Sequence, residues 1–96
     1  MKIVYEKQFV DTFDDIIAYI NQDSPQAAIN FAKNLKQKFE LLQDNPKMYQ
    51  KSKYFDIDCY RDMTFMGYTI IYKIADETIS VLDIFKWIEK DRNIYE

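Results

Sequence analysis

The segment CYRDMTFMGYTIIYKIADETISVLDIFKW, residues 59–87, decides the fold of this 96-residue chain. It holds three tandem runs rich in β-branched and aromatic residues, at 59–65, 68–74 and 78–85, which are predicted to be strands. Gly67 marks a turn between the first two runs, and Ala75-Asp76-Glu77 marks a turn between the last two. Because short connections make neighbouring strands antiparallel, the segment is predicted to be a three-stranded meander.

Two amphipathic helices are predicted ahead of this meander. Apolar residues spaced by three and four form one stripe on the first helix, made of Phe9, Val10, Phe13, Ile16, Ile17 and Ile20. A second helix is expected to start at Ser24-Pro25, because a serine oxygen caps orphan N–H groups and proline is tolerated at the first helical position. Its stripe contains Ala28, Phe31, Ala32, Leu35, Phe39 and Leu42, and it should end near Asp44-Asn45-Pro46. Joined by so few residues, the two helices are predicted to form a helical hairpin.

The remaining segments complete an α+β domain that spans residues 1–96. Lys2 to Tyr5 alternates like a short first strand, and residues 47–58 show no period and are expected to be a loop. The predicted order is β-α-α-β-β-β, with a small, mostly antiparallel sheet and the helical hairpin packed on one face. The opposite face is expected to stay partly open. The tail from Trp87 to Tyr95 is predicted to form one or two helical turns.

Composition limits the classes of function. The net charge is −3 and there is no histidine, whereas nucleic-acid binders usually carry a basic excess. Residues 33–54 are an exception, with a local excess of about +4 that comes from six lysines. The single Cys59 cannot form an internal disulfide, which fits a reducing cytoplasm, and no apolar run is long enough for a membrane span. The acidic residues show no metal-site spacing, and no cofactor is expected.

The order and spacing of four motifs resemble the RelE/ParE superfamily of type II toxin–antitoxin toxins over nearly the whole chain. They are Phe13-Asp14-Asp15-Ile16-Ile17-Ala18-Tyr19-Ile20, Asp23-Ser24-Pro25-Gln26-Ala27-Ala28, Glu40-Leu41-Leu42 with Asn45-Pro46, and Gly67-Tyr68-Thr69-Ile70-Ile71-Tyr72. RelE-like members cleave mRNA in the ribosomal A site, and ParE-like members poison DNA gyrase. Both kinds are silenced by an antitoxin. The resemblance thus implies a cytoplasmic, growth-inhibiting toxin of the plasmid-stabilization type, with a cognate antitoxin and either gyrase or the ribosome and mRNA as partners.

The same resemblance allows the catalytic cations to be compared. RNA cleavage without a metal or histidine requires several positive groups at one phosphate. If the chain is a RelE-like, metal-independent endoribonuclease, the resemblance gives its catalytic residues as Arg61, Lys86, Arg92 and Tyr95. However, Thr69 stands where such enzymes carry an essential arginine, Met63 replaces an expected lysine, Trp87 lies close to another expected arginine, and Asp83 stands where ParE-like chains often have arginine. The alternative role for Arg61 is an ion pair with Asp62 or Asp83 on the strand surface.

Partner-binding residues are predicted in two places. Phe85 and Trp87 are candidate apolar anchors, with core packing as the alternative. Lys47, Lys51 and Lys53 could hold phosphates while nearby tyrosines stack on bases, or could serve solubility alone. The sequence favours ParE-like gyrase inhibition, followed by a RelE-like ribonuclease and then by a degenerate module that binds only its antitoxin. Self-association is left open.

Overall fold

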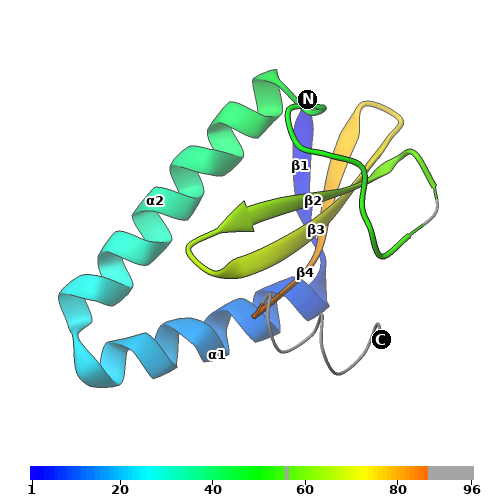
Figure 1. Cartoon of the computed structure of the whole chain (residues 1–96). Coiled ribbons are helices and arrows are strands. Elements are labelled where there is room, and N and C mark those ends of the chain that lie inside the picture. Colours follow the sequence, from blue (N-terminus) through cyan, green and yellow to red (C-terminus); the bar gives the residue numbers. More distant parts are fainter. Residues whose placement is uncertain (56, 87–96) are drawn as a thin grey trace.

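The computed structural model describes residues 1–55 and 57–86, and the order of its elements confirms the predicted α+β fold (Figure 1). The elements are β1 (Lys2–Tyr5), α1 (Lys7–Asp23), α2 (Pro25–Asp44), β2 (Tyr60–Phe65), β3 (Tyr68–Ala75) and β4 (Thr78–Lys86). The predicted helical tail, with Trp87, Arg92 and Tyr95, lies outside the described residues.

The four strands form one mixed sheet in the order β1-β4-β3-β2. β2 with β3 and β3 with β4 are antiparallel, as the short turns predicted. β1 is parallel to β4, with Ile3 opposite Ile79. The register between β3 and β4 shifts once, because Ile71 faces Asp83 whereas Tyr72 faces Val81. Leu82 is therefore the extra residue of a β-bulge.

Local chemistry explains where the helices begin and end. The Ala27 N–H donates to the Ser24 hydroxyl oxygen at 3.1 Å, and Pro25 occupies the first helical position, so α2 starts where the sequence predicted. At the other end, the Asn45 N–H donates to the Leu41 carbonyl at 3.1 Å. From Ser24 the two helices diverge as the arms of a V rather than running closely side by side (Figure 1).

The core lies between this V and one face of the sheet. Its residues come from alternate strand positions and from the inner helix faces: Phe9, Phe31, Leu35, Phe39, Leu42, Met63, Phe65, Ile70, Tyr72, Ile79, Val81 and Ile84. Aromatic rings fill much of it, and the Phe31 ring meets Phe65 edge to face at 5.1 Å. Both helices thus pack on the same face, as predicted.

The expectation of an open second face is wrong at Thr69, Ile71 and Phe85, which are 1, 4 and 6% exposed. The 46–59 loop folds back along β2 instead of leaving the sheet. The Ser52 N–H donates to the Tyr60 carbonyl at 2.8 Å. The adjoining Tyr54 ring meets Phe85 edge to face at 5.5 Å. No described helix is both long and apolar enough to cross a membrane.

Candidate functional site

An apolar groove opens in the mouth of the V, between β1 and the two helices. It has a volume of about 300 Å³ and is lined by Tyr5, Phe9, Val10, Phe13, Ala32, Leu35, Lys36 and Phe39. The Tyr5 ring lies 5.7 Å from Phe9 and 5.4 Å from Phe39, measured between ring centroids. Even so, Tyr5 remains 45% exposed and Val10 39%. A partner that covered these side chains would gain roughly 25 cal/mol for each Å² of apolar surface removed from water.

Sequence reasoning missed this groove because it assigned both helical stripes to the core. A signal was present, since Val10 adjoins Phe9 and Ala32 adjoins Phe31, so each stripe is wider than a helix needs to face one core. The structure buries Phe9 and Phe31 and leaves Val10 exposed. The outer part of the stripe therefore lies at the surface and is not part of the interior.

Arg61 anchors a loop. Its Nη1 donates to the Tyr49 carbonyl at 2.8 Å, and its Nε is buried without a hydrogen bond in the described part of the chain. The alternative role, an ion pair with Asp62 or Asp83, is not formed in the described part of the chain, where both carboxylates accept from backbone N–H groups and Asp62 Oδ1 has no hydrogen-bond partner. Asp62 accepts from Lys53 at 3.0 Å, and Asp83 accepts from Ile84 at 2.8 Å.

Tyr72 on β3 contacts the same loop as Arg61 on β2. The two residues face each other across β2 and β3, and the Tyr72 hydroxyl donates to the Pro46 carbonyl at 2.8 Å. Burial raises the pKa of Tyr72 to about 12, although the Arg61 charge opposes this rise. The phenol therefore stays protonated at neutral pH and remains a donor. Together the two side chains fix both ends of the segment from Pro46 to Tyr49.

The two candidate catalytic cations in the described residues do not converge. Arg61 pairs with Tyr72 and Lys86 pairs with Tyr68, so the cations lie four residues apart along β3 and on strands either side of it. At about 3.4 Å per residue and about 4.8 Å per strand, their Cα atoms are roughly 17 Å apart. Fully buried Met63, on the strand of Arg61, is part of the core that separates them.

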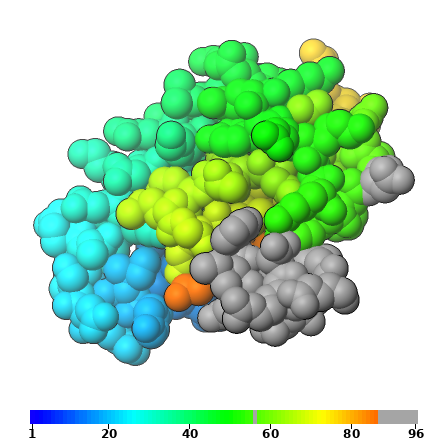
Figure 2. All heavy atoms as spheres, in the orientation of Figure 1, coloured from blue at the N-terminus to red at the C-terminus, as the bar shows by residue number. Residues whose placement is uncertain are grey.

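The basic loop keeps its predicted position at the surface. Lys51 forms a 2.6 Å ion pair with Asp58, which lowers the pKa of that carboxyl through the hydrogen bond and the positive charge. The Lys53 Nζ lies 5.3 Å from the Tyr54 ring centroid, and Lys47 is exposed. The space-filling view shows this segment, in bright green, as a continuous outer surface (Figure 2). The loop also exposes three apolar side chains, those of Met48, Phe55 and Ile57.

The predicted sites are thus spread over the molecule. The lysines lie on the loop, Arg61 lies under it, and Phe85 is buried against Tyr54. The other predicted residues, Trp87, Arg92 and Tyr95, lie outside the described part. Within residues 1–55 and 57–86, no cluster of three or more acidic or cysteine side chains could hold a metal ion.

Comparisons with known proteins agree with this architecture. A family model described as the ParE toxin of the type II toxin–antitoxin system parDE matches residues 3–86. Among solved structures, one described as the chromosomal ParDE TA system from P. aeruginosa superposes with a TM-score of 0.71 and 15% sequence identity. The match covers 90% of this chain and 95% of that one, and at this identity it shows the shared fold alone. No curated protein sequence gives a significant match.

Proposed function

Because the chain belongs to the ParE toxin family of type II toxin–antitoxin systems, we propose that it inhibits growth by binding a macromolecular target, namely DNA gyrase. The observation that carries a binding mechanism is the separation of Arg61 from Lys86 by four residues along β3 and by two strand spacings, which corresponds to roughly 17 Å between Cα atoms. Cleavage of RNA would require these charges to act on one phosphate. Residues 1–96 would form one toxin domain that acts in the cytoplasm, where gyrase is found.

Two details support binding over cleavage. The Arg61 guanidinium already donates to the Tyr49 carbonyl, so moving it onto a phosphate would release the loop. Thr69 is 1% exposed, so this position offers neither a cation nor access for RNA. The basic loop with Lys47, Lys51 and Lys53 is the proposed contact surface for the target, because it combines positive charge with exposed apolar side chains.

We assign the apolar groove in the mouth of the V to the cognate antitoxin. The groove is preformed, and Lys36 is its one charged lining residue among the described ones. An amphipathic segment with acidic residues beside its apolar face would bury Tyr5 and Val10 and place a carboxylate near Lys36. This groove and the basic loop are different surfaces. The bound antitoxin would therefore neutralise the toxin either by sterically blocking the approach of the target or by restraining the two helices.

The test is induced expression in bacteria, scored for growth, transcript integrity and an SOS reporter. Gyrase inhibition predicts growth arrest with intact transcripts and SOS induction, together with stabilised cleavage complexes when purified protein is added to gyrase and supercoiled DNA. Arrest with fragmented transcripts would instead support the ribonuclease alternative. No arrest, with a folded protein that still binds its antitoxin, would leave only the degenerate module.

A further inference from the structure

The basic loop is attached to the edge of β2 as a short hairpin. The Asp62 N–H donates to the Gln50 carbonyl at 3.2 Å, and the Ser52 N–H donates to the Tyr60 carbonyl at 2.8 Å. These bonds pair the first half of the loop with β2, so residues 53–59 form the tip of a hairpin. The tip lies on the side of the sheet away from the V of helices (Figure 1).

Two apolar side chains are exposed at this tip. Phe55 is 41% exposed and Ile57 is 56% exposed. The Phe55 ring stacks on the Tyr60 ring with the centroids 4.4 Å apart and the planes at 21°. The Tyr60 N–H also donates to the Ile57 carbonyl at 3.1 Å. Because Tyr60 belongs to β2, both residues are tied to the sheet. Apolar side chains held in place in this way lose little conformational entropy when a partner covers them.

The surroundings of the tip are basic. The Asp58 carboxylate forms a 2.6 Å ion pair with Lys51, which neutralises its charge. The Lys73 Nζ lies 5.7 Å from the centroid of the Tyr60 ring, and Lys47 is exposed on the same loop. A partner surface with carboxylates around an apolar pocket would therefore complement the tip in both charge and polarity.

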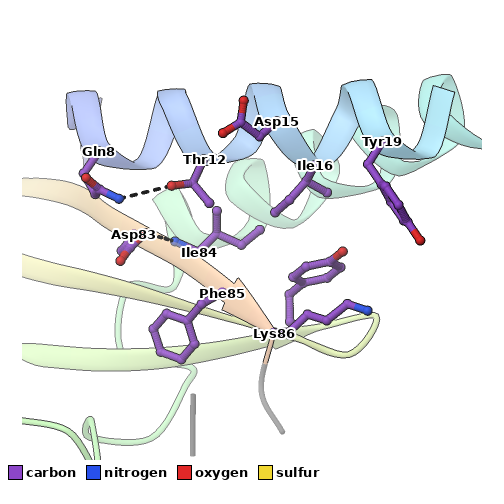
Figure 3. Close-up of a pocket in the computed structure, with 10 residues that line it drawn as sticks. Gln8, Thr12, Asp15, Ile16, Tyr19, Asp83, Ile84, Phe85 and Lys86 are labelled. Atoms are coloured by element: carbon purple, nitrogen blue, oxygen red, sulfur yellow. Dashed lines mark hydrogen bonds between the residues drawn. The ribbon is translucent and has the colours of Figure 1, made fainter. Parts of the chain in front are cut away.

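The described surface beside α1 has the opposite charge. A cavity of about 370 Å³ lies between α1 and β4, and Asp15 and Asp83 contribute carboxylates to its lining (Figure 3). Lys86 is the one cation among the described residues of that lining. A partner rimmed by carboxylates would be repelled there. The charge distribution thus directs such a partner to the basic loop.

We infer, on the basis of the function proposed above, that Phe55 and Ile57 anchor the toxin in an apolar pocket of gyrase that is rimmed by carboxylates. A few side chains that fill a pocket carry most of the affinity of an interface, whereas charges at the rim mainly raise the association rate. Lys47 and Lys73 therefore steer the approach, and the two apolar residues hold the complex together. The loop recognises the gyrase protein and not the DNA that gyrase binds.

The test is surface plasmon resonance of the full chain with purified gyrase holoenzyme. Phe55→Ala and Ile57→Ser should each weaken binding by about tenfold or more, through faster dissociation. Met48→Ser is the matched control, because Met48 is an exposed apolar residue of the same loop that lies before the paired segment. It should change the affinity by less than about twofold. Lys47→Ala should slow association and leave the dissociation rate unchanged.

Salt dependence separates a protein pocket from nucleic acid. Raising the salt concentration from about 50 to about 200 mM would weaken binding about 40-fold if three lysines contacted phosphates. Anchoring in an apolar pocket predicts a loss of less than about tenfold. A 40-fold loss, or saturable binding of the chain to linear duplex DNA without gyrase, would overturn the inference.

The outcomes also distinguish this inference from the proposed function. If the unmodified chain does not bind gyrase, the proposed function fails and the inference fails with it. If the chain binds gyrase, and both tip variants melt like the parent protein and bind as tightly, the inference alone is overturned.

Discussion

The Tyr72 hydroxyl on β3 donates a 2.8 Å hydrogen bond to the carbonyl oxygen of Pro46, which lies just beyond the end of α2. This contact joins residues 26 positions apart and fixes the start of the loop that folds along β2. Tyr72 is fully buried, so its ring belongs to the core, and its hydroxyl positions the loop through this hydrogen bond. One side chain thus couples the core to the surface that we propose for target binding.

Tyr72→Phe should lower the free energy of unfolding by about 1 kcal/mol, because it leaves the Pro46 carbonyl without this donor. The measurement is urea denaturation followed by circular dichroism. Tyr68→Phe is the matched control, since the Tyr68 ring packs on Phe31 and its hydroxyl makes no hydrogen bond that the structure records. Equal losses in the two variants would contradict the role of the Pro46 contact.

The same residue predicts loss of stability in alkali. The folded-state pKa of Tyr72 is about 12, above the ordinary value of 10.0, because burial disfavours the phenolate. A group with a raised folded pKa contributes its full stability below the unfolded pKa and loses it as pH rises through the folded value. Stability should therefore fall between about pH 10 and 12. Urea titrations across this range should show a shallower fall in Tyr72→Phe, and identical slopes would count against the prediction.

Arg61→Ala should lower the free energy of unfolding by about 1–2 kcal/mol, because it removes the charged donor to the Tyr49 carbonyl. Arg61→Lys keeps the charge and loses the geometry of the guanidinium. If the chain acts by binding, growth inhibition by each variant should follow its measured stability. Abolished toxicity in a variant that melts like the parent protein would instead identify Arg61 as a catalytic residue.

Val10→Glu should weaken antitoxin binding at least tenfold, or by about 1.4 kcal/mol, because it buries a charge in the apolar groove. Val10 is 39% exposed, so the free protein should keep its stability. Leu41→Glu is the matched control, since Leu41 is an exposed apolar residue of α2 outside this groove. Calorimetric titration with the antitoxin gives both affinities. Equal affinities would place the antitoxin elsewhere.

Glu77→Gly should raise the free energy of unfolding by about 1 kcal/mol, because Glu77 adopts a left-handed backbone with φ of 59° that glycine enters without strain. Its neighbour Asp76 has φ of 53°, which aspartate tolerates better. Ala75→Gly, at the end of β3, is the control and should destabilise the protein. Thermal melts of the three proteins decide the order of stability.

The sequence determined the elements of this protein, because helices, caps and tight turns depend on residues close together in the chain. The sequence predicted the period of the apolar stripes, the Ser24 cap with Pro25, and a turn at Gly67. In the structure Gly67 occupies the β2–β3 turn with φ of 87°. Arg61 and Thr69 could also be compared with the residues of related toxins from the sequence alone, because the comparison needed only their positions in a motif.

Only the tertiary structure decided how these elements meet. The parallel pairing of β1 with β4, the groove in the mouth of the V, and the contact of Arg61 with Tyr49 depend on segments distant in the chain. A local pattern gives the face of a helix that is apolar, but it does not give the angle between two helices or the length by which one strand outruns another. Packing of the aromatic core sets that angle, and the angle determines which apolar side chains stay exposed for a partner.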